Sequence, residues 1–369
     1  MTVFEAYWYK LTFAFQQLMP TNTILVVGGN GIIGRNTVSY LLSTRNWNTL
    51  VTSASALDYD TSARYVQLDL LDPEAVAGQA EQLREVTHVF YAAYIEGKTL
   101  AAQTDVNLAL LCNLVTGLEQ TAPNFRHITF IQGGKAYGAH LGRYKTPALE
   151  TDPRHFPPNF YYSQEDFLRE QSAGKAWSWT AVRPDIVVGF AVGNPMNLAN
   201  LIAVYASLCK ELKVPFRFPG SLQAYQVLVN VTDATLLSEG MEWVATHDEC
   251  REEIYNVTNG DVFRWSQLWP KFAEYFGVEY AEPITFPLQE YMADKADLWQ
   301  QMVQKHGLNP HTLDELVQWP FGDFIFNVEA DAFFDVNKLR RAGFHRMHLD
   351  SFTSFRNQFE QLKAEKIIP

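Results

Sequence analysis

The sequence of 369 residues has room for one large α/β domain or for two domains, and 47% of it is hydrophobic and 19% charged. This balance is typical of a globular protein and excludes a disordered chain. The formal net charge of −12 argues against nucleic acid or an anionic membrane surface as a partner. The three cysteines, Cys112, Cys209 and Cys250, are widely spaced. They indicate neither a disulfide framework nor a metal site, and they favour a reducing cytoplasm.

The N-terminal segment, Met1–Pro20, is rich in aromatic residues. It lacks a basic start and a cleavage site, so it is not expected to be a signal peptide. No apolar run approaches the roughly 18 residues of a membrane span, and we expect a cytoplasmic protein without a membrane partner. The segment is either an amphipathic helix that docks on the domain or an over-extended start, since Met19 shortly precedes the first strand.

A glycine-rich turn follows the first predicted strand, Thr23–Val27, whose residues are apolar or β-branched. The glycines are Gly28, Gly31 and Gly34, and the apolar-periodic segment Asn36–Leu42 comes next. Strand, glycine turn and helix together predict the start of a dinucleotide-binding βαβ unit. Glycine lets the backbone turn sharply and approach a pyrophosphate closely, and the first N–H groups of the helix favour its charge.

Strands and helices then alternate along the chain. The further predicted strands are Thr49–Ser53, Ala63–Asp69, His88–Ala93, Arg126–Gln132 and Trp179–Arg183, and the predicted helices are Pro73–Leu83, Thr99–Gln120 and Asn159–Gln171. This alternation predicts an α/β fold with a doubly wound parallel sheet of the Rossmann type. Gly133–Pro158 has little periodicity and is predicted to be a long ordered loop, and such loops at carboxyl strand ends are usually functional.

The second half of the chain is mostly helical in pattern. The predicted helices are Asn194–Lys210, Thr232–Ala245, Phe263–Phe276, Leu288–Lys305 and Asp350–Ala364, with a strand at Gln226–Val231. We expect these segments to form a smaller, mostly helical substrate cap interleaved with the last strands of the sheet. The predicted organisation is an N-terminal extension over 1–20, a dinucleotide-binding domain over 21–190 and the cap over 191–369.

The end of the second strand normally meets the adenosine ribose of the cofactor. An acid there favours NAD, whereas an Arg or a small residue admits the phosphate of NADP. The chain has Ser53, Ala54 and Ser55 at this place, which favours NADPH with NADH possible. Arg35 or the serines are candidate phosphate partners, and Asp69 lies where such folds hydrogen-bond the adenine.

The GxxGxxG spacing resembles that of the short-chain dehydrogenase/reductase superfamily. Its reductases place a Tyr hydroxyl and a Lys ammonium beside the nicotinamide, usually as YxxxK on one helical face. The Lys lowers the pKa of the phenol. Two such pairs, Tyr94–Lys98 and Tyr291–Lys295, lie too early and too late in the chain, and Tyr162 is followed at the fourth position by Asp166. Lys135, in GGKAYG at the end of the fifth strand, is the candidate replacement.

Three motifs, GGKAYG, PNFYYSQEDFL and RPDIVVGF, make the chain similar to the progesterone 5β-reductase/iridoid synthase-like branch of the extended short-chain reductases. FPGS, FRWSQLWPKFAEYFG and NKLRRAGF extend the similarity, so that it covers roughly Thr23 to Pro369. Two departures stand out. The family's GTKHY is GGKAY here, and its paired arginines after the second strand are Ala54 and Ser55.

The resemblance implies that Tyr162 and Lys135 are the catalytic couple and that the aromatic residues Tyr94 and Phe321 line the substrate site. It also implies cofactor contacts at the glycine turn and at later strand ends, namely Asn30, Ile32, Ile33, Asp69, Leu70, Ala92, Ala93, Pro184 and Ile186. With Gly28, Gly31, Gly34, Arg35 and Ser53, these are the predicted cofactor-binding residues.

The expected function is therefore NAD(P)H-dependent 1,4-reduction of an activated C=C bond in a small-molecule enone or enal. A homodimer is a possible assembly. One alternative is 1,2-reduction of a carbonyl or a sugar-nucleotide reaction, in which Tyr162 would act as a general acid. Another is an NADP-sensing protein without turnover, against which the intact Tyr/Lys couple argues.

Overall fold

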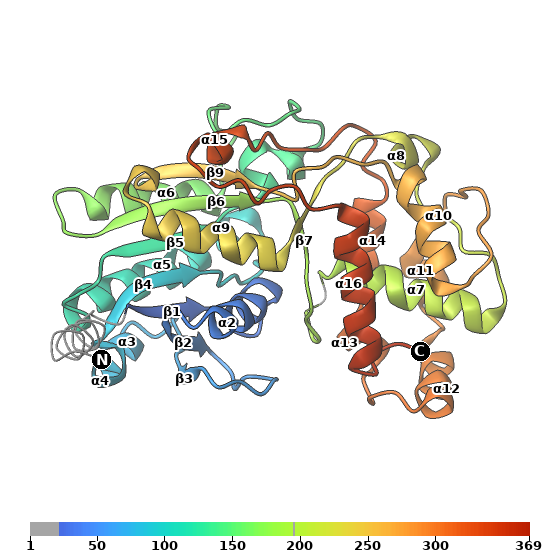
Figure 1. The fold of residues 1–369 in the computed structure, drawn as a ribbon, viewed down its shortest axis with the longest axis horizontal. Helices are drawn as coiled ribbons and strands as arrows, with labels where there is room; N and C mark the ends of the chain where they lie inside the picture. The colour runs from blue at the N-terminus through green and yellow to red at the C-terminus, as the bar shows by residue number, and fades with distance from the viewer. Residues whose placement is uncertain (1–21, 195) are drawn as a thin grey trace, which may run out of the picture.

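The computed structural model describes residues 22–194 and 196–369, so the expectations for the N-terminal segment lie outside the described residues. A helix-covered sheet forms one half of the molecule and a helical cap forms the other (Figure 1). The sheet is parallel and has the strand order β3-β2-β1-β4-β5-β6-β9. Its strands are β1 (Thr23–Val27), β2 (Asn48–Ser53), β3 (Arg64–Gln67), β4 (Val86–Tyr91), β5 (His127–Ile131), β6 (Ser178–Pro184) and β9 (Glu253–Val257).

The strand order reverses between β1 and β4, which confirms the predicted doubly wound fold. In such sheets the reversal opens a binding site at the carboxyl ends of the strands. The helices around the sheet are α2 (Ile32–Thr44), α3 (Ala75–Gly78), α4 (Ala80–Leu83), α5 (Leu100–Thr121), α6 (Phe160–Ser172) and α9 (Ala234–Thr246).

Alternation along β1 builds two cores, one on each face of the sheet, because successive strand side chains point to opposite faces. Leu25 and Val27 pack with residues of α5, whereas Ile24 and Val26 pack with residues of α2 and α9. All four are essentially inaccessible to solvent. A strand buried on both faces needs such a continuous apolar run, and the sequence TILVV supplies it.

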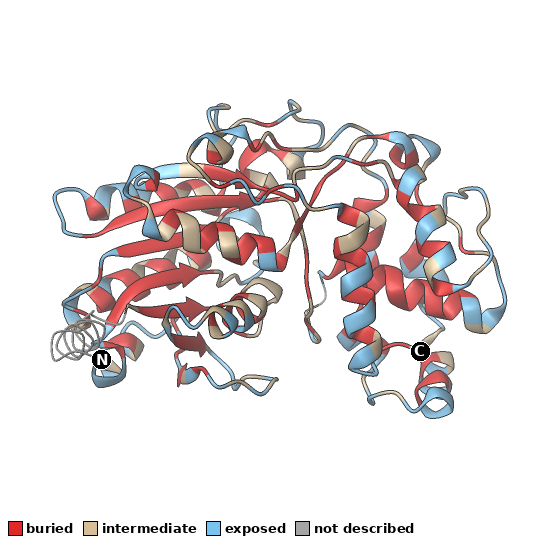
Figure 2. Ribbon diagram, viewed as in Figure 1, coloured by how far each residue is buried: buried red, intermediate tan, exposed pale blue. Residues whose placement is uncertain are grey.

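The cap has an aromatic core of its own. Phe216 stacks on Trp269 with ring centroids 4.6 Å apart, and Phe326 meets the same indole edge-on. Figure 2 shows α7 buried along most of its length between the other cap helices. The elements here are β7 (Ile186–Val188), α7 (Leu198–Leu212), α8 (Leu222–Gln226), β8 (Val231–Asp233), α10 (Trp265–Phe276), α11 (Leu288–Met292), α12 (Ala296–His306), α13 (Leu313–Leu316), α14 (Trp319–Ile325) and α16 (Ser351–Ala364).

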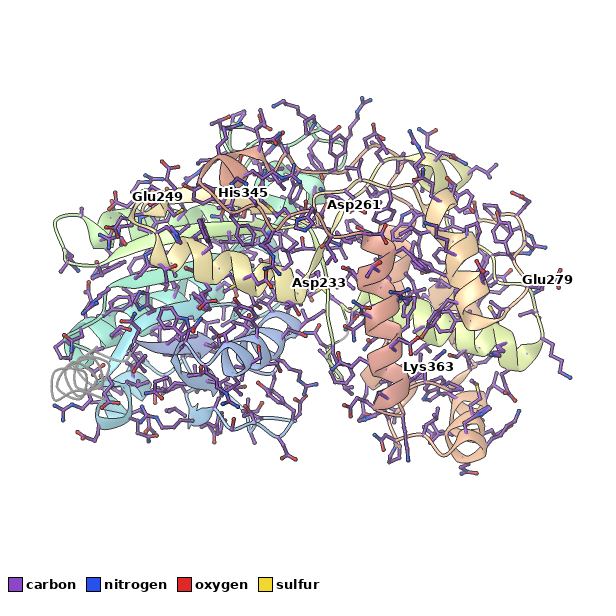
Figure 3. The ribbon with its side chains drawn as sticks, in the orientation of Figure 1. Asp233, Glu249, Asp261, Glu279, His345 and Lys363 are labelled. Carbon is purple, nitrogen blue, oxygen red and sulfur yellow. The ribbon has the colours of Figure 1, made fainter. Side chains whose placement is uncertain are left out.

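Polar side chains join the cap to the sheet near the start of α16. Asp233 and Asp261 lie at this junction, between the two halves of the molecule (Figure 3). The Asp261 carboxylate accepts hydrogen bonds from the backbone N–H and the hydroxyl of Ser351, and Asp233 accepts one from the Ser354 hydroxyl. The buried amide of Asn259 donates to both serines. Every member is paired, so the junction avoids the cost of unpaired buried polar groups.

Three predicted elements differ from the structure. Gln226–Val231 is not a continuous strand, because Gln226 ends α8 and Val229 forms only isolated bridges before β8 begins. Leu288–Lys305 is two helices, α11 and α12, with the break at residues 293–295, where no proline or glycine marks it. Pro73–Leu83 is likewise divided into α3 and α4. The short strands β7 and β9 and helix α15 (Asn337–Arg341), which lies beside β9, were not predicted.

Among the described residues, no helix has both the length and the apolarity needed to cross a membrane. Nor does that part of the chain bring together three or more His, Cys, Asp or Glu side chains that could hold a metal ion.

Two buried histidines lie side by side at the amino ends of β4 and β5. His88 and His127 lie opposite each other in the register of β4 and β5. The ring of His88 is hydrogen-bonded to the Thr87 hydroxyl, and the ring of His127 is hydrogen-bonded to the Ser178 hydroxyl. Burial, followed by the charge of Arg126, lowers the pKa of His88 to about 4. Burial, followed by the presence of His88, lowers the pKa of His127 to about 3. Both rings are therefore neutral in the folded protein at neutral pH.

These histidines predict a loss of stability in mild acid. Below about pH 6.5 the unfolded chain takes up two protons that the folded chain excludes, so the free energy of unfolding falls by up to about 1.4 kcal/mol per pH unit for each histidine. The loss begins at the unfolded pKa and ends only below the lowered folded values. Urea unfolding between pH 7 and 5 should show a steeper decline for the wild type than for the double variant His88→Gln, His127→Gln.

A third histidine serves as the control. His345 is exposed and lies near α15 (Figure 3). The variant His345→Gln should keep the pH dependence of the wild type. Equal slopes for the wild type and the double variant would contradict the prediction.

Candidate active site

The glycine turn joins β1 to α2 by close backbone contacts. The backbone N–H groups of Gly28 and Gly29 both donate to the carbonyl of Thr52, and that of Gly31 donates to the carbonyl of Gly28. Gly28 has a φ of 92°, a conformation that favours glycine. A Cβ at Gly34 would lie 2.2 Å from the Gly28 carbonyl oxygen, so helix and strand can approach this closely only through glycine.

Gly31 differs from Gly34, because a side chain there would meet far less of the protein. A Cβ there would meet only the Gly28 carbonyl oxygen at 3.3 Å and the Asn194 amide nitrogen at 3.9 Å. Gly31 is also the N-cap of α2, and no side chain caps the helix. The first N–H groups of α2 therefore remain available to a phosphate. This cradle fits the pyrophosphate of a dinucleotide, with Ile32 and Ile33 in the first turn of the helix.

The adenosine end of the site is formed by small polar groups. The Asn30 amide donates to the hydroxyls of Ser53 and Ser55, each over 3.2 Å, and to the carbonyl of Ala56 over 2.9 Å. Asn30 thus fixes the loop after β2. Ala54 and Ser55 are exposed, and no cationic side chain in the described residues pairs with either serine.

Arg35 is not free to bind a phosphate. Its guanidinium is buried, forms an ion pair with Asp58 and stacks on the ring of Tyr59, with 4.3 Å from its central carbon to the ring centroid. Arg35 was predicted as a candidate partner of the cofactor phosphate, but its charge is neutralised by Asp58. The serines remain as the candidate partners at this end of the site.

The other predicted cofactor contacts lie at the carboxyl ends of the parallel strands. Ala92 is in close contact with the glycine turn, since a Cβ at Gly28 would lie 2.9 Å from the Ala92 backbone. Asp69 is exposed after β3, and its carboxylate accepts a hydrogen bond from the N–H of Leu71, whereas Leu70 is buried. Pro184 ends β6 and Ile186 begins β7.

Lys135 lies in a short 3₁₀ helix, Gly134–Tyr137, directly after β5. Asn159 holds this turn by donating from its amide to the Lys135 carbonyl. The Lys135 ammonium lies 5.6 Å from the centre of the Tyr94 ring and has no ion pair within the described chain. Burial lowers its pKa below the ordinary value of a lysine. It is therefore a desolvated, unpaired cation at the carboxyl end of the sheet.

The Tyr162 hydroxyl is fully occupied by the backbone. It donates to the Ala136 carbonyl over 2.8 Å and accepts from the His155 N–H over 2.9 Å, while the Arg154 guanidinium covers the ring. The side chain is only 6% exposed. Tyr162 thus fastens the loop 133–158 to α6.

Tyr161, the first tyrosine of the pair, points in a different direction from Tyr162, toward Gly133 and Pro184. A Cβ at Gly133 would lie 3.3 Å from the Tyr161 hydroxyl oxygen and 3.5 Å from the Pro184 carbonyl oxygen, so the phenol reaches between the ends of β5 and β6. The hydroxyl forms no hydrogen bond within the described residues. Burial, followed by the presence of Tyr94, raises the pKa of this phenol.

The phase of α6 separates the two tyrosines, because consecutive residues on a helix point about 100° apart. Tyr162 lies on the face of Glu165 and Asp166, which both form ion pairs with Arg154 of the loop. Tyr161 lies on the face of Gln164, whose amide donates to a carbonyl of α5. Asp166, four positions after Tyr162, is the signal in the sequence that this tyrosine shares a face with an acidic residue that pairs with the loop.

A cavity of about 510 Å³ lies beside this site, between the loop after Lys135 and the cap. Its walls are formed by residues 139–144, 185–186, 229–230, 265, 324–325 and 327–332. Phe321, a predicted substrate contact, is not among them. It packs against the cap core, and Phe324 and Ile325 of the same helix, α14, line the cavity instead.

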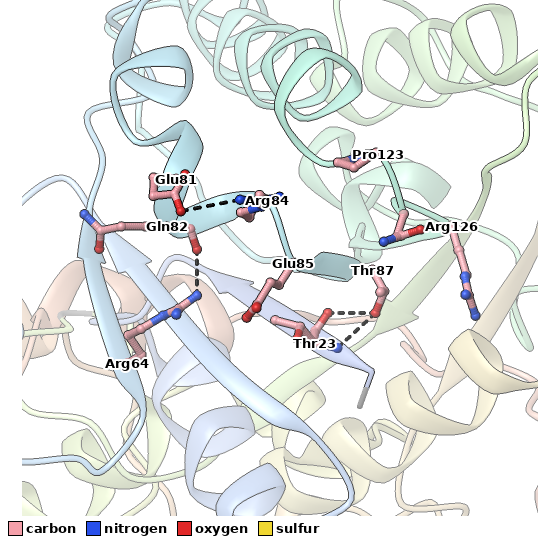
Figure 4. A pocket seen from close by; sticks show the side chains of 10 residues that line it. Thr23, Arg64, Glu81, Gln82, Arg84, Glu85, Thr87, Pro123 and Arg126 are labelled. Carbon is pink, nitrogen blue, oxygen red and sulfur yellow. Dashed lines mark hydrogen bonds and ion pairs between the residues drawn. The ribbon is translucent and has the colours of Figure 1, made fainter. Parts of the chain in front are cut away.

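A second cavity, of about 740 Å³, lies at the opposite end of the sheet. Its walls include Thr23 and Thr87, at the amino ends of β1 and β4, and the charged side chains of Arg64, Glu85 and Arg126 (Figure 4). The glycine turn, Lys135 and Tyr161 all lie at the carboxyl ends of the strands. This cavity is therefore separate from the candidate active site.

The doubly wound sheet and its glycine turn define a Rossmann-class protein. Residues 55–369 match the PRISE-like Rossmann-fold domain, and the chain belongs to that family. This match confirms the resemblance carried by the motifs around Lys135 and Tyr162.

Relatives of similar length support the assignment. A short chain dehydrogenase from Penicillium aethiopicum is 32% identical over 95% of this chain and 100% of its own length. An (S)-8-oxocitronellyl enol synthase from Nepeta racemosa is 33% identical, covering 94% of this chain and 92% of its own. A 3-oxo-Delta(4,5)-steroid 5-beta-reductase from Arabidopsis thaliana is 33% identical, covering 83% and 80%. The dehydrogenase and the reductase place the chain among oxidoreductases.

Solved structures share the fold at low identity. The UDP-glucose 4-epimerase of Thermotoga maritima has a TM-score of 0.66 and 17% identity, and the match covers 93% of this chain and 99% of the epimerase. The Bordetella bronchiseptica enzyme WbmG has a TM-score of 0.65 and 13% identity, covering 94% and 97%. At these identities the likeness shows the fold alone.

The two glycines of the turn predict different mutant phenotypes. Gly31→Val should leave the protein folded, since its backbone is extended and its Cβ would make one tight contact, 3.3 Å to the Gly28 carbonyl oxygen, but should weaken NADPH binding by at least about 100-fold by filling the pyrophosphate cradle. Gly34→Ala should lower the free energy of unfolding by about 1–3 kcal/mol, because its methyl group overlaps the Gly28 carbonyl. Fluorescence titration and thermal unfolding measure the two effects. Unchanged cofactor affinity in a folded Gly31→Val protein would contradict the assignment of the cradle.

Proposed function

We propose that the protein is an NAD(P)H-dependent reductase of C=C bonds conjugated to a carbonyl, acting by 1,4-addition on an enone or enal. The observation that carries this proposal is that a free phenol, Tyr161, and an unpaired ammonium, Lys135, both lie at the carboxyl ends of β5 and β6. The relative named as a 3-oxo-Delta(4,5)-steroid 5-beta-reductase supports the same class of substrate.

The residues at the glycine turn fit a nicotinamide dinucleotide. Gly31 and the first N–H groups of α2 would hold the pyrophosphate, Ser53 and Ser55 the adenosine ribose, and Pro184 with Ile186 the carboxamide end. When bound, the cofactor supplies a hydride to the β-carbon of the substrate. The protein's own contribution is to hold the substrate carbonyl and to stabilise the charge that develops on it.

Tyr161 is proposed to hydrogen-bond the substrate carbonyl oxygen. As negative charge develops on that oxygen, the phenol donates to it and the Lys135 ammonium stabilises it from beside the Tyr94 ring. Both groups are partly removed from water, where such interactions are stronger. Because the phenol pKa is raised, the hydroxyl stays protonated and serves as a donor. Solvent can protonate the resulting enolate later, so Tyr161 need not give up its proton.

Tyr162 is proposed to be a positioning residue in place of the catalytic residue that the sequence suggested. Its two hydrogen bonds, to Ala136 and from His155, fix both ends of the segment that presents Lys135. The tyrosine pair thus combines one phenol that holds the loop with one that faces the substrate.

The two tyrosines should respond differently to the loss of a hydroxyl. Tyr161→Phe should lower kcat for 2-cyclohexen-1-one by about 10²–10³, the usual cost of losing one oxyanion donor. Tyr162→Phe should retain kcat within a few-fold and lose about 1 kcal/mol of stability through its unpaired backbone partners. Steady-state NADPH oxidation and urea unfolding measure the two effects. The reverse order of activities would restore Tyr162 as the catalytic tyrosine.

A substrate comparison separates 1,4- from 1,2-reduction. Cyclohexanone has a carbonyl but no conjugated C=C bond, so the wild type should leave it unreduced while reducing 2-cyclohexen-1-one. If the saturated ketone is reduced as fast as the enone, carbonyl reduction replaces the proposed reaction.

The cofactor preference is proposed to be for NADPH, and to be modest. Ser53 puts no acid against the extra phosphate, but Arg35 is paired with Asp58 and cannot bind it. Ala54→Arg should raise the ratio of kcat/KM for NADPH over NADH by about tenfold, because an Arg–phosphate pair is a strong charge-assisted contact. The control Ala176→Arg, an exposed alanine before β6 at the opposite end of the sheet, should leave the ratio unchanged. A wild type that uses NADH equally well would show that the serines do not select the phosphate.

A further inference from the structure

The cavity beside the active site contains polar groups that reduction of a bare enone does not require. Its volume of about 510 Å³ lies in the range that holds a whole small-molecule ligand. Ile186, Val229, Trp265 and Ile325 give it apolar walls, as such sites usually have. Among these walls lie a carboxyl group, Asp185, and a phenol, Tyr144.

Asp185 directly follows Pro184 at the end of β6 and has no cationic partner within the described chain. One carboxylate oxygen accepts a hydrogen bond from the Ile186 N–H over 2.9 Å. In the orientation of the Asn230 amide that satisfies all its neighbours, the amide nitrogen donates to the other oxygen over 2.9 Å. Burial raises the pKa of Asp185 to about 7, so the group is costly to bury without a further donor.

Tyr144 faces the same space with an unused hydroxyl. Its ring packs against Tyr137 and Phe334, which restricts its direction. The hydroxyl makes no hydrogen bond within the described residues. Burial, followed by the charge of Asp185, raises the pKa of the phenol, so the hydroxyl stays protonated and can donate. Tyr144 and Asp185 thus place a donor and an acceptor in the wall of one cavity.

The charged groups around the cavity are mainly acidic. Asp185, Glu329 and Asp331 line it, against a single basic side chain, Arg143. His140 also lines it, with a buried Nδ1 that lacks a partner in the described residues, and burial lowers the pKa of that ring below its ordinary value. The net negative charge of these groups would repel a ligand carboxylate, but it would not repel a neutral polar group.

We infer that this cavity binds the part of the substrate that extends beyond the reacting C=C bond, and that this part carries a hydroxyl group held between Asp185 and Tyr144. The ligand O–H donates to the Asp185 carboxyl, and its oxygen accepts from the Tyr144 phenol. The inference rests on the proposed reductase function and adds to it a class of substrate, the neutral hydroxy-enones. An ether has no O–H group, so it cannot donate the hydrogen bond that an alcohol donates to the Asp185 carboxyl.

The test uses three probes that differ only at the remote end: testosterone, its methyl ether, and the corresponding 3-oxo-androstene carboxylic acid. In the wild type, kcat/KM for testosterone should exceed that for the methyl ether by about tenfold or more, and the acid should be poorer still. In Asp185→Ala the ratio of alcohol to ether should fall to about one. In Asp185→Asn, which keeps the shape and removes the charge, the acid should gain about tenfold relative to the alcohol.

The matched control is Asp297→Asn, which removes an exposed negative charge from the first turn of α12 and should leave both ratios unchanged. Thermal unfolding and NADPH titration identify any variant that fails to fold. An alcohol-to-ether ratio near one in the wild type would overturn the inference. A high ratio that persists in Asp185→Ala would overturn the assignment to Asp185.

Failure of the proposed function has a different signature. If the wild type reduces neither testosterone nor 2-cyclohexen-1-one, the reductase proposal fails. The cavity is then tested by calorimetric binding of testosterone and its methyl ether in the presence of NADP. An alcohol that binds about tenfold more tightly than its ether supports the hydroxyl site without the reaction, and equal binding overturns it.

Discussion

The loop that follows Lys135 is tied to the sheet by one buried side chain, Asn256 on β9. Its amide donates to the carbonyls of Ala148 and Asp335, and its carbonyl oxygen accepts from the Tyr137 hydroxyl over 2.5 Å. Asn256 is inaccessible to solvent, so losing its side chain would remove all three of these hydrogen bonds from the interior, and the Ala148 carbonyl would keep only its bond from the N–H of Asp335. A strand at the sheet edge thereby fixes an irregular loop that has little secondary structure to hold it.

In the proposed site, the residues that fix the loop differ from those that would act on the substrate. Tyr162 has both of its hydrogen-bonding capacities used by the loop, whereas Tyr161 and Lys135 keep theirs open. Groups whose geometry is fixed before the substrate arrives need no reorganisation as charge develops, and this is the usual source of electrostatic catalysis. The cost is a phenol and an ammonium partly buried without partners, which the surrounding hydrogen bonds must offset.

Some features of the fold and of the candidate site can be predicted from short stretches of the sequence, whereas others depend on contacts between residues far apart in the chain. The buried run Thr23–Val27 and the glycines after it predict both the first strand and the cofactor cradle, because steric demands at a turn leave few other residues possible. The strand β9, with the sequence EIYNV, is short and half polar, and only its pairing with β6 makes it a strand. Helical phase distinguishes Tyr161 from Tyr162, yet the pairing of Arg35 with Asp58 brings together residues of separate elements and has no signature in the sequence.

The position of β9 late in the chain has a consequence for folding during synthesis on the ribosome. Thr180 pairs in register with Glu253, so about 70 residues, including α7, α8 and α9, must be synthesised between the two partners. Until then β6 is an exposed edge, and unpaired edges invite pairing with other chains. Closing so long a connection also slows folding. The nascent chain is therefore most vulnerable to aggregation while the segment between β6 and β9 is being made, and chaperones would be needed most at that stage.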